Sequence, residues 1–255
     1  ATSHLVVTYD GSRARLYVNG TLVSTDIRTK IPTPIANRVL AFQPHGNTTL
    51  MYVTDEGAPA NRAFVRIREG VDTYTLREIS ASNKYLLDLA QFENSWYMAV
   101  GSVSDPRIHI YKDAFDVLKK GETKPLAPYT VMRVDNPQYL SFSANTRFIG
   151  VQSGSRFAVY DADEKKHYVY DTKLALLPNQ KATWMDGHRY TVVSGNKLIM
   201  FDFDGINQQT LVNVAPEYQP YFDRDYNALF TVGPSASDPA KAAIIRTELR
   251  TEEDR

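Results

Sequence analysis

Acidic residues are the first whose types and spacing suggest chemistry. Asp161-Ala162-Asp163 and Asp202-Phe203-Asp204-Gly205 space two carboxylates as in the opening of a calcium-binding loop. Such a loop needs more oxygen ligands and a closing acid at a fixed offset, and no Glu stands at that place after Gly205. We therefore interpret both segments as turns, in which the acids accept hydrogen bonds from nearby backbone N–H groups.

No sequence motif indicates a nucleophile, a general base or a cofactor loop. The chain has no cysteine, which excludes a thiol nucleophile, thiolate metal sites and disulfides. HExxH, GxSxG, GxGxxG and Walker-type patterns do not occur in the sequence. The histidines fall in separate segments, as His4, His45, His109, His167 and His188. We therefore assign no catalytic residue, no metal ligand and no cofactor, and we expect a protein that is not an enzyme.

Two tyrosines and one arginine are the candidate binding residues. Tyr139, in the segment DNPQY, and Tyr218, in APEYQP, lie in polar connections between strand-like segments. Aromatic rings beside polar groups suit stacking on sugars or gripping peptides, although each ring can also pack back on its own sheet. Arg156 lies in a turn, and its side chain can face either way.

Charge and composition narrow the class of partner. The 29 basic residues balance the 29 acidic ones, which argues against nucleic-acid or anionic-membrane binding, because both need a positive field. No apolar run approaches the roughly 18 residues of a membrane-spanning helix, and we identify no signal-peptide pattern within the residues given. Because the sequence begins at Ala1, we expect a fragment or processed product, with any membrane anchor upstream.

A repeated order of short strands is expected to position these residues. After Phe142 come a polar turn, an apolar strand over 148–151, a strand over 157–160 and a strand over 167–170. The same order recurs, at spacings of roughly 40–50 residues, around the markers Phe42, Leu89, Trp184 and Phe222. The aromatic markers hold one position of the repeat, so we expect them in the core.

This repeat predicts an all-β fold, a β-propeller of four-stranded antiparallel blades. One blade has two apolar faces and cannot bury both alone, so it must pack against its neighbours. We count five recognisable units plus a partial one, which allows six blades, in a single domain over 1–255. The units are approximately 1–35 (partial), 36–80, 81–135, 136–175, 176–213 and 214–250.

The two ends and one insertion depart from the regular unit. The first unit is expected to lack its first strand, which suggests truncation at the N-terminus, and the last unit to lack its fourth. The spacing between the markers Leu89 and Phe142 is the longest, and this stretch includes a helical pattern over 114–120.

Several segments resemble the propeller-like region of PEGA-domain-containing envelope proteins from small, host-dependent bacteria: NPQYLSFSANTRFIGVQSGSRFAVYDAD, KATWMDGHRY, PYFDRDYNALFTV and, more weakly, WYMAVGS. The turn pattern is also similar to TolB-type and WD-type propellers, although VYD and MFD stand where WD repeats carry Trp-Asp. The resemblance implies a membrane helix, a small PEGA domain and a propeller-like region displayed outside the membrane. This sequence contains no obvious complete PEGA domain.

The N-terminal segment supports a second reading. HLVVTYDGSRARLYVNGTLV looks like a hairpin of LamG-type, concanavalin-like lectin domains, with turns at Asp10-Gly11 and Asn19-Gly20. Asn-Gly and Asp-Gly serve any tight hairpin, so we favour a simple blade hairpin over a lectin for this segment. A lectin predicts a jelly-roll sandwich over 1–60 and bound calcium.

We therefore expect a monomeric, non-catalytic propeller that acts as a scaffold or recognition module of the bacterial cell envelope. It would bind protein or glycan partners through loops between blades, with Tyr139, Tyr218 and Arg156 as contacts. Two alternatives stay open at this point. One is the lectin, and the other is a propeller hydrolase or lyase in which acids such as Asp88, Asp135, Asp186 and Asp223 converge near the axis.

Overall fold

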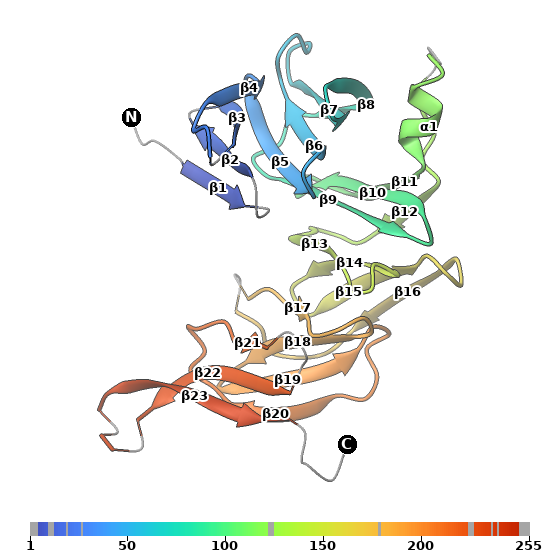
Figure 1. The fold of residues 1–255 in the computed structure, drawn as a ribbon. Coiled ribbons are helices and arrows are strands. Elements are labelled where there is room, and N and C mark those ends of the chain that lie inside the picture. The colour runs from blue at the N-terminus through green and yellow to red at the C-terminus, as the bar shows by residue number, and fades with distance from the viewer. Residues whose placement is uncertain are drawn as a thin grey trace. The chain divides into compact units, whose positions relative to one another are not determined.

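The chain is described by a computed structural model over residues 5–9, 13–18, 20–26, 28–121, 125–177, 180–223, 227–235, 237–238 and 240–249. Contacts divide the chain into two compact units, Ala1–Leu140 and Ser141–Arg255. The described residues form six antiparallel sheets, each built from strands that follow one another in the sequence (Figure 1).

The first three sheets use the strands up to residue 133. The first contains β1 (Leu5–Tyr9), β2 (Arg13–Val18), β3 (Thr21–Asp26) and β4 (Pro32–Ala36). The second contains β5 (Val39–His45), β6 (Thr49–Thr54), β7 (Arg62–Glu69) and β8 (Asp72–Ser80). The third contains β9 (Tyr85–Phe92), β10 (Ser95–Ser102), β11 (Asp105–Lys112) and β12 (Thr130–Arg133), and α1 (Ala114–Leu118) follows β11.

The remaining three sheets repeat this order. The fourth contains β13 (Tyr139–Phe142), β14 (Phe148–Ser153), β15 (Arg156–Asp161) and β16 (Lys166–Asp171). The fifth contains β17 (Thr183–Trp184), β18 (Arg189–Ser194), β19 (Lys197–Asp202) and β20 (Gln209–Asn213). The described part of the sixth contains β21 (Tyr221–Phe222), β22 (Ala228–Pro234) and β23 (Ala242–Glu248).

The inner strands form because their sequences are nearly continuous apolar runs. Every residue of β6 is buried, and so are the first five of β14. A continuous apolar run is typical of a strand that is covered on both faces, whereas alternation marks a strand with one exposed face. The fourth strand β8 behaves differently, since it lies at the edge of its sheet and most of its residues are exposed or half-buried, with Leu76 buried.

Each unit contains an apolar core between neighbouring sheets. In the first unit, one cluster combines β6, β7 and β10 residues with α1, and Met51, Ile67, Met98 and Phe115 are among its members. In the second unit, an aromatic cluster joins the fourth and fifth sheets. Trp184 stacks on Tyr190 with ring centroids 3.7 Å apart, and such pairs add about 0.5–1.5 kcal/mol beyond the area that they bury.

The strand predictions for the repeat are confirmed, and so is the helix, which covers Ala114–Leu118. The prediction that the first unit lacks a strand is wrong, because β4 completes a four-stranded sheet. Its sequence, PTPIA, carries two prolines, which argue against a strand from sequence alone. The structure tolerates them because β4 is an edge strand.

The marker aromatics are half-buried rather than fully buried. Phe42, Trp184 and Phe222 each pack against a buried cluster. They lie on β5, β17 and β21, which are edge strands of their sheets, so one side of each lacks a neighbouring strand. Position in the sheet therefore explains their partial exposure.

Candidate functional site

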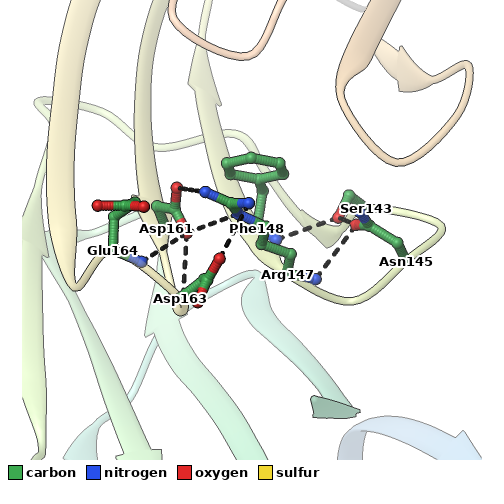
Figure 2. A network of polar contacts seen from close by, with 7 residues as sticks. All are labelled: Ser143, Asn145, Arg147, Phe148, Asp161, Asp163 and Glu164. Atoms are coloured by element: carbon green, nitrogen blue, oxygen red, sulfur yellow. Dashed lines mark hydrogen bonds and ion pairs between the residues drawn. The ribbon is translucent and has the colours of Figure 1, made fainter. Parts of the chain in front are cut away.

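Asp161, at the end of β15, is the centre of a polar network (Figure 2). Its carboxylate is fully buried, and Arg147 binds both oxygens, with Nε 2.9 Å from Oδ1 and Nη2 2.6 Å from Oδ2. Oδ1 also accepts hydrogen bonds from the backbone N–H groups of Asp163, at 3.0 Å, and Glu164, at 3.2 Å. The predicted turn role of Asp161 is confirmed.

Arg147 connects the two acids of this turn. Its Nη1 lies 3.0 Å from Oδ2 of Asp163, and the hydrogen bond to Asp161 raises the pKa of the guanidinium above its ordinary value. The second acidic segment also forms a turn. Asp202 Oδ2 accepts a hydrogen bond from Asn207 Nδ2 at 2.6 Å, and Asp204 Oδ1 accepts one from Ile206 N–H at 3.3 Å.

Side-chain oxygens also hold the turn after the first strand in successive sheets. Asp186 Oδ1 accepts the backbone N–H groups of His188 and Arg189, at 2.7 and 2.8 Å. Asp223 Oδ1 accepts those of Asn227 and Ala228, at 2.8 and 3.1 Å. These acids, two of the four considered for an active centre, therefore have structural bonds in their own turns.

The three binding residues predicted from sequence lie on different elements. Tyr139 begins β13, is half-buried, and has the ammonium of Lys84 4.5 Å from its ring centroid. Tyr218 is 48% exposed in the connection from β20 to β21, and Arg156 is exposed at the start of β15. Tyr139 belongs to the first unit and the other two to the second. Their role in binding stays a prediction.

A groove runs between the second and third sheets, within the first unit. It consists of two adjoining clefts of about 340 and 560 Å³, which share Arg77, Glu78 and His109. We call the smaller cleft the polar end and the larger one the apolar end. The polar end is lined by residues that include Arg62, Arg77, Glu78, Ser80, Asp105, Arg107 and His109. The apolar end is lined by residues that include Phe64, Thr75, Leu118, Pro125, Leu126 and Pro128.

The arginines of the polar end are not equivalent. Arg62 pairs with Glu78 and donates to Ser80 Oγ at 3.1 Å, and Arg107 Nε lies 2.9 Å from Asp105 Oδ1. Arg77 Nη1 donates to the hydroxyl of Tyr111 at 3.2 Å, and its Nε to the carbonyl oxygen of Glu78 at 3.4 Å. Within the described part of the chain, no carboxylate pairs with Arg77.

His109 lies beside this arginine with a polar atom unsatisfied. Its Nδ1 is buried and has no hydrogen-bond partner among the described residues. Burial, and to a smaller extent the positive charge of Arg77, lower the pKa of His109 to about 4. The imidazole is therefore neutral at pH 7.

Sequence reasoning missed this groove, because its walls come from two different sheets. One signal was present in β11, where Asp105, Arg107, His109 and Tyr111 follow one another at every second position. Residues spaced by two share one face of a strand. That alternation predicts a polar face that ends in a buried tyrosine, and Tyr111 is only 2% exposed.

A third cleft, of about 590 Å³, lies between the first and second sheets. Its lining is rich in hydroxyl and apolar groups, such as Ser24, Thr33, Ile31 and Val71, and among the described residues it includes no aromatic ring. A sugar site commonly relies on such rings for stacking.

In the described ranges, no three His, Asp or Glu side chains gather as metal ligands. No helix in these ranges is long and apolar enough to cross a membrane.

The sheets and their order define a propeller-type fold, and comparison with solved structures agrees. The chain is similar to one in the crystal structure of the mitotic checkpoint complex, with a TM-score of 0.58, 12% identity, and coverage of 96% of this chain and 75% of that one. A chain of the tricorn protease matches at a TM-score of 0.49 and 12% identity, over 95% of this chain and 26% of that one.

At such low identity, the first likeness shows the fold alone, and that fold is the β-propeller. No protein-family model matches the chain, and no curated protein matches it either. Membership of the PEGA-domain group therefore stays a prediction from the segments that resemble it.

Proposed function

We propose that this protein is a non-catalytic recognition module that binds a peptide segment of a protein partner in the groove between β8 and β11. The observation that carries the proposal is the composition of the groove, which is charged at one end and apolar at the other. A peptide fits such a groove, because its apolar side chains can be buried while a charged group is paired.

A protein partner is favoured over a glycan by the position of the rings. In the described ranges, the aromatic residues that line the groove are Phe64 and Tyr111, and Tyr111 is buried in the core between the sheets. Leucine and proline side chains supply much of the remaining apolar surface. Such a surface suits apolar peptide side chains better than the face of a sugar ring. Display at the bacterial envelope is part of this proposal and is supported by the PEGA resemblance.

The test is a displayed library of random peptides, selected against the wild-type protein. The peptides that bind are then measured against Thr75→Trp, in which an exposed residue of the apolar end becomes large enough to fill it. We expect the affinity to fall about tenfold or more, because the cleft loses the volume that a side chain needs.

Thr73→Trp is the matched control. Thr73 is also exposed on β8 and lines neither cleft of the groove. Circular dichroism establishes that both variants are folded. The proposal fails if no peptide is selected, or if peptides bind Thr75→Trp and Thr73→Trp equally well.

A further inference from the structure

Among the described residues, the polar end of the groove has an arginine, Arg77, that no carboxylate pairs with. Three arginines line it against two carboxylates, and both carboxylates are engaged by Arg62 and Arg107. Arg77 is left with a tyrosine hydroxyl and a backbone carbonyl as hydrogen-bond acceptors. A guanidinium presents five N–H donors in a planar fork, so Arg77 keeps donors that a planar anion can accept.

His109 supplies a second donor beside it. An imidazole with its proton on Nδ1 donates from that atom, and here Nδ1 is buried without a partner. A buried polar atom without a hydrogen-bond partner destabilises the fold. An acceptor that binds Arg77 and also reaches this nitrogen would therefore satisfy His109 as well.

We propose that Arg77 and His109 form a carboxylate-binding site, which receives an acidic side chain or the C-terminal carboxylate of the bound peptide. This inference rests on the proposed function, since the carboxylate belongs to the peptide in the groove. A carboxylate fits better than a phosphate, because Glu78 and Asp105 also line this end and would repel a doubly charged group more strongly.

The site couples binding to protonation. The charges near His109 are Arg62 on β7, Arg77 and Glu78 on β8, and Asp105 and Arg107 on β11. A bound carboxylate offsets the repulsion from Arg77 and stabilises the imidazolium, so the pKa of His109 rises on binding from its value of about 4. Binding then takes up protons, and the affinity increases as the pH falls through the bound-state pKa toward the free-state value of about 4.

The experiment uses the peptides selected by the wild-type protein, each synthesised in three forms. One form is unchanged, one has its acidic side chains replaced by amides, and one has an amidated C-terminus. The last two forms separate a side-chain carboxylate from a terminal one. We expect one of them to bind about tenfold more weakly than the unchanged peptide, because charge-assisted hydrogen bonds are lost.

Two further measurements assign the effect to this site. Arg77→Gln should weaken the unchanged peptide about tenfold and its amide form little. Arg68→Gln, on β7 and outside both clefts of the groove, should weaken neither. In the wild-type protein, NMR titration of the His109 ring should show a pKa that rises when the peptide is bound, and this readout needs no variant.

The outcomes separate the inference from the proposed function. One outcome would overturn the carboxylate site alone: peptides bind and Thr75→Trp blocks them, but their amide forms bind equally well and the pKa of His109 does not rise. The proposal that the groove binds peptides would then be retained. If no peptide binds at all, the proposed function itself is wrong.

Discussion

At the scale of single residues, Asp161 illustrates what a buried acid requires. Its carboxylate is 0% exposed, and two arginine N–H groups and two backbone N–H groups satisfy its oxygens. A buried charge that loses its partner is strongly destabilising, whereas an exposed pair contributes little. Breaking an arginine–aspartate pair should therefore destabilise the fold far more at a buried site than at an exposed one.

Arg147→Gln tests this difference. We expect it to lower the free energy of unfolding by about 3 kcal/mol, because Asp161 is left buried without its counter-charge. The matched control is Arg38→Gln. Arg38 pairs with Asp55 through side chains that are 64% and 34% exposed, so its loss should cost at most about 1 kcal/mol. Urea denaturation measures both values, and equal losses would contradict the account.

Residue types alone predicted the role of the acids and did not predict the groove. Asp161 and Asp163 were identified as turn residues because the calcium-loop pattern lacks its closing ligand. His109 was interpreted as an isolated histidine, since its neighbour Arg77 is on a different sheet and 32 positions away in the numbering. Contacts between sheets depend on packing, which a single sequence does not encode locally.

At the scale of elements, β14 shows how closely neighbouring sheets pack. A Cβ atom built on Gly150 would lie 1.6 Å from the hydroxyl oxygen of Tyr190 on β18. It would also lie 3.0 Å from the indole ring of Trp184 on β17. The fourth and fifth sheets therefore approach each other at a position where a side chain has no room.

Gly150→Ala should consequently be destabilising, by about 3 kcal/mol, because the added methyl group overpacks a well-filled core. Tyr190→Phe removes the oxygen that collides with it, although ring carbon contacts near 2.9 Å remain. The same glycine substitution should therefore cost less in the Tyr190→Phe background. Thermal or urea denaturation of the wild type, the two single variants and the double variant measures the coupling between Gly150 and Tyr190. Additive losses would show that the two residues do not meet.

Strands were predictable where apolar runs and turn residues agreed. β14 and β15 follow directly from the pattern around Ser153-Gly154-Ser155, and Gly154 has the positive φ of 57° that such a turn favours. β4 was missed, because Pro32 and Pro34 remove backbone donors and read as a loop. The prolines are tolerated because β4 lies at the edge of its sheet. That position depends on how the neighbouring strands pair.

At the scale of the whole molecule, the repeat accounts for the fold, and the proposed function depends on the groove between the second and third sheets. The described sheets follow a common order, and backbone hydrogen bonds close many of the turns between their strands. Among the described residues, the groove between β8 and β11 contains Arg77, which no carboxylate pairs with, and His109, whose Nδ1 has no hydrogen-bond partner. These two residues are the reason to propose binding in the groove. Neither Tyr218 nor Arg156 lines the groove.

Hydrogen–deuterium exchange of the full chain, with and without a peptide selected from the library, tests this assignment most directly. We predict slower exchange on binding in Asp72–Ser80 and Asp105–Lys112, the strands that wall the groove. Protection that is confined to other segments, such as the connection that contains Tyr218, would contradict the account and would indicate a binding site in the loops between sheets.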